Sequence, residues 1–204
     1  MKRRESGFTL LEVLVAGALG LMLLGLLHQF LVPIIETSSR VTAEEHLTDQ
    51  GLLVLSRLSS ELAESTPGSL SFSGPETNQR RVVGVTRRDG VSAEGRKLWR
   101  KEASVYFWDQ QSGQVRWRSW PPAPPDFGLI PRVDRPLVFS SDELNTLSNT
   151  VGGSKLLASD VIEFQPFVDW PPTYSVTSRI VLEKKVPGER DAHCEWSRVT
   201  AFKN

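Results

Sequence analysis

The hydrophobic residues of this chain follow three patterns in succession. From residue 8 to residue 35 the chain is almost continuously apolar, and a helix needs only about 20 such residues to cross a bilayer. From residue 36 to residue 64 the apolar positions recur as on one face of an amphipathic helix. This stripe, which should pack on a sheet, consists of Leu47, Gly51, Val54, Leu55, Leu58 and Leu62. Beyond residue 65, short alternating runs predict strands joined by long loops.

A hairpin is predicted within the β-rich part. Residues 105–120 contain two alternating runs around a glycine-containing loop. In the second run, Val115 and Trp117 should lie on one face and Arg116 and Arg118 on the other, because successive strand residues point to opposite sides.

Other stretches predict further strands and one short helix. Strands are expected at residues 69–73, 81–86 and 196–202, and a helix should begin at the capping-box pair Ser140 and Glu143 and continue to about residue 148. Two more strands should each place one set of residues at alternate positions. These sets are Ile162, Phe164 and Val168 in the stretch 156–169, and Tyr174, Val176, Ile180 and Leu182 after it. One long helix followed by a mostly antiparallel sheet is an α+β pattern.

The start of the apolar run contains charged residues that are candidates for a functional role. Residues 2–5 hold three basic side chains and one glutamate, and basic residues before an apolar helix keep that end in the cytoplasm. This leader ends at Gly7, Phe8 follows, and one carboxylate, Glu12, lies inside the run. An ionised group in a membrane-spanning helix costs roughly 2.5–3.5 kcal/mol on insertion scales, so we expect Glu12 to be functional.

Glycine, then phenylalanine, then glutamate at the fifth place after the glycine resembles the class III signal of type IV prepilins and pseudopilins. The resemblance covers about the first 30 residues. It implies that a prepilin peptidase cuts between Gly7 and Phe8 and then N-methylates Phe8. It also implies that Glu12 meets the terminal amine of a neighbouring subunit during filament assembly. Elementary physics agrees, because a carboxylate in hydrocarbon needs a cationic partner.

The resemblance implies a pilin-like fold in which a long N-terminal transmembrane and amphipathic helix packs on an antiparallel β-sheet head. It divides the chain into a basic leader peptide (1–7), a transmembrane segment (8–35), an amphipathic continuation (36–64) and a β-rich head (65–204). The expected location is the bacterial inner membrane, with the head extracytoplasmic, and afterwards a pilus or pseudopilus. The expected partners are prepilin peptidase, other major and minor pilins or pseudopilins, the inner-membrane assembly platform and the lipid bilayer.

Two other interpretations of the N-terminus remain open. An ordinary secretory signal would be cut after the apolar run, yet no small-x-small site follows residue 27. In a plain signal anchor, Glu12 would lie near the headgroups without a role.

Small residues and one proline interrupt the apolar run. Ala16 and Gly20 form a small-xxx-small pair, and Gly17 and Gly25 lie on either side of Gly20. These residues either allow helices to approach closely in a filament core or simply reflect the composition of membrane helices. Pro33 removes a backbone donor and is expected to kink the helix.

Length and layout narrow the expected role. Residues 156–167 are similar to the C-terminal half of J-type minor pseudopilins and related long minor type IV pilins, and Glu12 differs from the pattern of K-type subunits. The predicted function is therefore a minor pilin or pseudopilin, at or near the filament tip or initiation complex. This similarity does not separate type II secretion from type IV pili.

Candidate reactive residues are few. With a single cysteine, Cys194, no internal disulfide forms, and this residue is either a small buried side chain or a reactive thiol. The three histidines, His28, His46 and His193, are scattered without metal-ligand spacing or a nucleophile motif. The sequence therefore predicts neither an enzyme nor a cofactor or metal site.

Charge is balanced overall, with 24 basic and 24 acidic residues, but it is unevenly distributed. Residues 80–101 hold eight Arg and Lys and two carboxylates, with tryptophans nearby, whereas residues 36–64 hold six carboxylates and two Arg. Three interpretations stay open: an inert solvated surface, a nucleic-acid-binding head of a minor pilin in a DNA-uptake pilus, or an acidic stalk and a basic head that steer neighbouring subunits into register.

Overall fold

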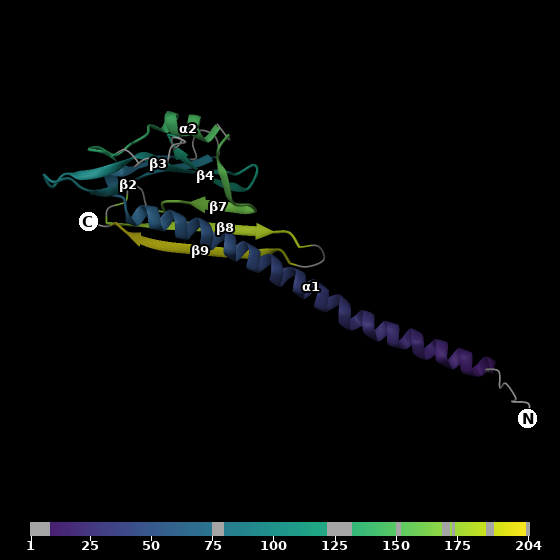
Figure 1. Ribbon diagram of the computed structural model, residues 1–204. Helices are drawn as coiled ribbons and strands as arrows, with labels where there is room; N and C mark the ends of the chain where they lie inside the picture. Colours follow the sequence, from purple (N-terminus) through teal and green to yellow (C-terminus); the bar gives the residue numbers. More distant parts are fainter. Residues whose placement is uncertain are drawn as a thin grey trace, which may run out of the picture.

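The chain folds as a long helical stalk with a β-rich head at its far end (Figure 1). The computed structural model describes residues 9–74, 80–121, 132–149, 152–168, 172, 174–186 and 190–202. Helix α1 (Leu10–Ala63) has 54 residues, which at 1.5 Å per residue corresponds to about 80 Å. The predicted helix over residues 8–64 is thus confirmed to within two residues, and Phe8 lies outside the described part.

The head contains one further α-helix, one 3-10 helix and nine strands among the described residues. In chain order they are η1 (Pro67–Ser69), β1 (Leu70–Ser73), β2 (Arg80–Val91), β3 (Lys97–Asp109), β4 (Gln114–Trp120), β5 (Arg132–Val133), α2 (Ser141–Asn149), β6 (Lys155–Ala158), β7 (Val161–Gln165), β8 (Ser175–Lys184) and β9 (Ala192–Ala201).

The strands form two antiparallel sheets. The larger sheet has the order β1-β2-β3-β4-β6, with β5 paired to β3, and the smaller has the order β7-β8-β9. Helix α2 lies on one side of the larger sheet, and the end of α1 runs along the smaller sheet on the other side (Figure 1). The α+β fold class with the helix packed on antiparallel sheet is confirmed.

The predicted stripe on α1 forms part of the main core. All six of its members are buried, and they pack with residues from both sheets, including Val83, Tyr106, Phe164 and Ile180. A second, smaller core lies under α2, where Leu144 and Leu147 cover Val82, Val105 and Phe107. Both faces of the larger sheet are therefore covered.

At Gly51, α1 lies close to the smaller sheet. A Cβ atom at this position would lie 2.9 Å from Cδ1 of Trp196 and 3.2 Å from Cδ1 of Leu182. Both distances are shorter than normal carbon–carbon contacts, so a side chain here would push the helix away from β8 and β9.

The predicted hairpin and short helix are confirmed in outline. Strands β3 and β4 pair around the loop at Gly113, and Val115 and Trp117 pack in the main core. Arg118 lies on the other side as expected, but it is buried and donates a hydrogen bond to the carbonyl of Leu147 on α2. The capping box is present, since Ser140 N donates to Oε2 of Glu143 over 2.8 Å.

Several strand predictions are wrong in detail. The stretch 156–169 contains two strands, β6 and β7, separated at Asp160, which has a positive φ of 60°. A register shift follows in β7, so Val161 and Phe164 are buried while Ile162 is 48% exposed. The predicted alternation of Ile162 with Phe164 fails because a bulge places two consecutive residues opposite one.

The other corrections concern strand ends. Val176, Ile180 and Leu182 alternate along β8 as predicted and are buried, but Tyr174 precedes β8 and is 82% exposed. The final strand begins at Ala192 rather than at residue 196, and β2 continues to Val91 rather than ending at residue 86.

Candidate functional site

The first turn of α1 is organised by Thr9 and Glu12. The side chain of Thr9 accepts a hydrogen bond from the Glu12 N–H over 3.3 Å, and Oε2 of Glu12 accepts from the Thr9 N–H over 2.8 Å. This is a reciprocal capping box, which satisfies two backbone donors that a helix start otherwise leaves free. Gly7 and Phe8, the predicted cleavage and methylation residues, lie outside the described residues.

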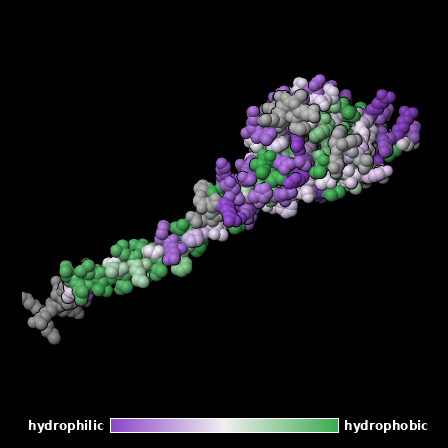
Figure 2. Space-filling model, turned by 180° about the vertical axis from the view of Figure 1, so that it is seen from behind, coloured by the Kyte–Doolittle hydropathy of each residue, from purple (hydrophilic) through white to green (hydrophobic). Residues whose placement is uncertain are grey.

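The apolar segment after Glu12 has no packing partner within the described chain. None of residues 10–35 is buried, and α1 is long and apolar enough to cross a membrane. Figure 2 shows the resulting hydrophobic surface along the stalk, which becomes hydrophilic toward the head. Glu12 shares a shallow groove on this segment with Leu11, Val15, Ala16 and Leu19.

The small residues of this segment face open space. A Cβ atom built on Gly17, Gly20 or Gly25 would meet nothing within 4 Å. Their lack of a side chain therefore serves no contact within the described chain, which fits close approach by another helix. Pro33 lies inside α1, and the helix continues through it without a break.

A family model supplies independent information on this segment. The model described as the prokaryotic N-terminal methylation motif matches residues 2–27. The match supports a type IV prepilin-like protein. For such a protein, the motif implies processing by prepilin peptidase and assembly with other pilins, and the apolar helix fits a membrane-anchored pilin. Comparison with curated proteins and with solved structures gave no match.

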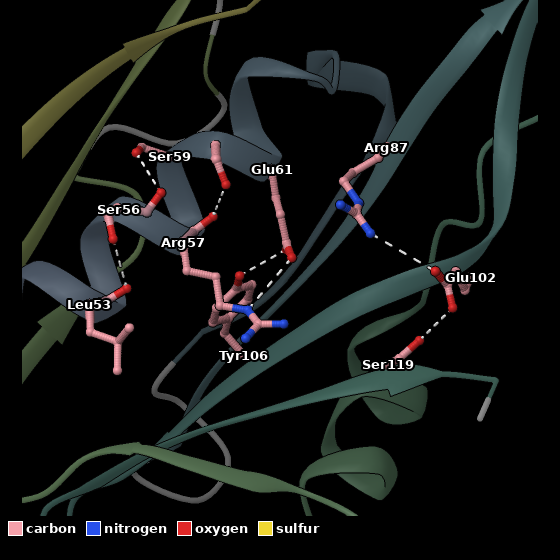
Figure 3. A network of polar contacts seen from close by, with 10 residues as sticks. Leu53, Ser56, Arg57, Ser59, Glu61, Arg87, Glu102, Tyr106 and Ser119 are labelled. Carbon is pink, nitrogen blue, oxygen red and sulfur yellow. Dashed lines mark hydrogen bonds and ion pairs between the residues drawn. The ribbon is translucent and has the colours of Figure 1, made fainter. Parts of the chain in front are cut away.

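The other end of α1 carries a buried polar network (Figure 3). Glu61 is only 4% exposed and accepts a hydrogen bond from the Tyr106 hydroxyl over 2.8 Å. Arg57 lies one turn earlier, with Nε 3.8 Å from Oε1 of Glu61, and its guanidinium stacks 3.6 Å from the ring centre of Trp117. The network fixes the last turns of α1 against β3 and β4.

Burial dominates the protonation of this network. Burial raises the pKa of Glu61, although hydrogen bonds from Tyr106 and Ser104 and the charges of Arg87 and Arg57 oppose the rise. The pKa of Tyr106 is raised well above its ordinary value by burial and by the adjacent Glu61. The tyrosine therefore remains a hydrogen-bond donor throughout the physiological range.

The sequence analysis did not identify this network. Glu61 follows Leu58 by three residues and Val54 by seven, so it lies on the buried face of α1. Its position on the same helix face as the apolar stripe was the feature of the sequence that could have indicated a buried carboxylate. Its partner Tyr106 could not be paired with it from the sequence, because 45 residues separate the two.

The basic segment does not form one uniform surface. Nη2 of Arg87 lies 3.9 Å from Oε1 of Glu102, and Nε of Arg100 lies 3.3 Å from Oδ1 of Asp89. Arg81 donates a hydrogen bond to the carbonyl of Phe164. The tryptophans nearby are mostly covered. Trp99 and Trp108 are each 5% exposed, and cations lie over the rings of Trp117 and Trp120.

The candidate reactive residues are not brought together. On β9, His193 is exposed with Nδ1 3.7 Å from Glu183, whereas Cys194 is partly buried and accepts a hydrogen bond from Nε1 of Trp196 over 2.7 Å. His28 and His46 are exposed positions on α1. Within the described ranges, no group of three or more His, Cys, Asp or Glu could hold a metal ion.

Proposed function

We propose that this chain is a minor pilin or pseudopilin, a structural subunit of a type IV pilus or a type II secretion pseudopilus. It is inserted in the inner membrane with its head extracytoplasmic, cut between Gly7 and Phe8, and N-methylated on Phe8. It then joins the filament at or near the tip or initiation complex, through the assembly platform and other pilins.

The observation that carries this proposal is the state of Glu12. Its carboxylate lies in an exposed apolar segment, and among the described residues only Thr9 is bonded to it. A capping box satisfies hydrogen bonds but leaves the negative charge without a counter-ion, which is costly in hydrocarbon. The terminal amine that cleavage creates on a neighbouring subunit would supply the missing positive charge.

The head supports a structural role. The buried face of α1 is used for docking on its own sheets, and His193 and Cys194 have separate partners. We therefore propose a non-catalytic subunit without a cofactor. The minor role is supported by the similarity of residues 156–167 to J-type subunits and long minor pilins.

Processing is tested by producing the full chain with and without a prepilin peptidase and measuring the intact mass and N-terminal sequence. We expect a product that begins at methylated Phe8 only when the peptidase is present. Gly7→Leu should block this cut, because a bulky side chain obstructs a protease that grips the backbone closely. A mature-sized product from Gly7→Leu would refute the cleavage site, and a cut beyond residue 27 would indicate a secreted domain.

Assembly is tested with a matched pair of substitutions at Glu12. Glu12→Gln keeps an oxygen that can accept the Thr9 N–H, whereas Glu12→Ala removes both the cap and the charge. Both variants should insert and be cleaved normally, and both should be lost from sheared filaments or from complexes with neighbouring pilins. If Glu12→Gln is incorporated like the unmodified chain, the charge is not needed and this role of Glu12 is wrong.

A further inference from the structure

The hairpin formed by β2 and β3 projects at the end of the head farthest from the N-terminus (Figure 1). Arg96, Lys97 and Lys101 are exposed there, and none of them forms an ion pair within the described part of the chain. Val91 is 59% exposed and pairs directly with Lys97, so the two side chains lie on the same face. We call these four residues the basic tip.

Oppositely charged residues lie where α1 enters the head. Glu45 and Asp49 are exposed one helical turn apart, and no cation among the described residues pairs with either. The nearby Arg40 is occupied by Glu44, whose Oε1 lies 2.8 Å from its Nε. Like charges at this spacing destabilise a helix, and an external cation would remove that cost.

Apolar side chains extend the same exposed face of the helix. Leu52 and Leu53 follow Asp49 by three and four residues and are 45% and 51% exposed. We call Glu45, Asp49, Leu52 and Leu53 the stalk stripe. The basic tip and the stalk stripe therefore match in two respects: each combines exposed apolar carbon with unpaired charge, and the charges are opposite.

We propose that the basic tip of one copy docks on the stalk stripe of a second copy that is displaced along the long axis of the molecule. Val91 packs against Leu52 and Leu53, while Lys97 and its neighbours approach Asp49 and Glu45. This inference rests on the proposed function for the displacement of neighbouring subunits along a filament, and it adds that two copies of this chain lie next to each other there.

A second copy is the occupant because one chain carries both surfaces at separate ends of its head. Two different, complementary patches on the same chain make a head-to-tail contact, which builds a ring or an open filament rather than a two-fold dimer. Nucleic acid fits the hairpin less well. Binding single strands relies on exposed aromatic rings for stacking, and Trp99 and Trp108 are each 5% exposed.

The docking is tested by disulfide formation between two differently tagged full-length copies, purified in detergent after production with prepilin peptidase. Both carry Cys194→Ser, which removes the single native cysteine. One copy carries Lys97→Cys and the other Asp49→Cys, and a disulfide joining the two tags requires Cα atoms within about 7 Å. Arg198→Cys, at an exposed cation on β9, replaces Lys97→Cys in the control. We expect roughly tenfold more product from the Lys97 pair, and equal yields would overturn the docking.

A second test of the docking reverses the charge on each surface. Lys101→Glu in the tip copy should lower the product, and Glu45→Lys in the stripe copy should restore it, since the reversed charges attract again. Product that is unaffected by Lys101→Glu, or a loss that Glu45→Lys does not restore, contradicts the proposal. Salt-sensitive binding of a single-stranded oligonucleotide to the same chains, without tag-to-tag product, would also overturn it.

The same samples distinguish a failure of the proposed processing from a failure of the proposed docking. The intact mass of each copy, taken before mixing, shows whether the peptidase has cut at Gly7–Phe8. A precursor mass contradicts the proposed processing. Correctly processed chains without tag-to-tag product contradict the docking and leave the proposed function standing.

Discussion

Helix α1 is one continuous helix with two different halves. In the apolar segment, residues 10–35, apolar residues surround the helix and none is buried, so Leu24 is 63% exposed. In the head segment, residues 43–63, apolar residues form a stripe that is buried against both sheets, and Leu58 is fully covered. The head segment finds its partner within the chain, whereas the apolar segment has no packing partner among the described residues and is long and apolar enough to cross a membrane.

Two carboxylates show the same contrast. Glu61 in the head segment is buried, with a hydrogen bond from Tyr106 and two arginines close enough to act on its charge. Among the described residues, Glu12 in the apolar segment bonds to Thr9 alone, through the local capping box. The fold therefore gives Glu61 its partners internally, whereas the proposed function assigns the counter-charge of Glu12 to a neighbouring subunit.

The largest expected effect is on the free energy of unfolding, when one leucine in each half of α1 is truncated to alanine. Leu58→Ala should lower the free energy of unfolding of the head by about 2–5 kcal/mol, because it leaves a cavity in the core. Leu24→Ala, the matched control, should change it by less than about 0.5 kcal/mol. Denaturant unfolding of the full chain in detergent, followed by tryptophan fluorescence, measures both. Equal losses would contradict the division of α1.

The next largest effect is expected when one glycine in each half of α1 is replaced by leucine. Gly51→Leu should cost about 1–3 kcal/mol, because the new side chain clashes with Trp196 and Leu182. Gly20→Leu meets open space in the single chain and should leave the unfolding of the head unchanged. Its effect should appear only as reduced association with other pilins, measured by co-purification. A stable Gly51→Leu head would show that α1 can move away from β9.

The smallest effect concerns the protonation of Glu61. Burial raises its pKa above the ordinary value of 4.5, so the folded head keeps this proton to higher pH than the unfolded chain does. Its contribution to stability is therefore complete below pH 4.5 and declines as the pH rises through the raised pKa, by at most about 1.4 kcal/mol per pH unit.

Glu61→Gln is the matched variant for this prediction, since it can still accept the Tyr106 hydrogen bond but does not titrate. The difference in unfolding free energy between the unmodified chain and Glu61→Gln should change with pH in that direction above pH 4.5. Parallel pH profiles of the two proteins would show that burial does not shift the pKa of Glu61.

Local patterns were sufficient for much of the fold. The six-residue stripe on α1 and the capping box at Ser140 are both present as predicted, because helix spacing and capping depend on residues within one or two turns. The strand predictions failed where pairing changes the alternation. The bulge at Ile162 and the break at Asp160 depend on the register with β8, which neighbouring residues along the chain do not specify.

The polar residues of the candidate site were likewise predicted only in part. The position of Glu12 in an apolar run indicated that it is functional, and the resemblance to the prepilin signal implied its role in assembly. The methylation motif matched over residues 2–27 supports a prepilin-like protein. The Glu61–Tyr106 network and the burial of Arg118 under α2 were not predicted. Both depend on segments that are distant in the sequence and meet only in the folded head.

The sequence by itself determined the long helix, its apolar and head segments, the position of Glu12 and the α+β class, because each follows from the order and spacing of residues along the chain. The tertiary structure alone decided which charges remain unpaired. The strand pairing of β2 with β3 and the packing of α1 on both sheets place Arg100 beside Asp89 and bury Glu61, while the basic tip and the stalk stripe stay exposed. Charges interact according to distance in space, and folding sets that distance.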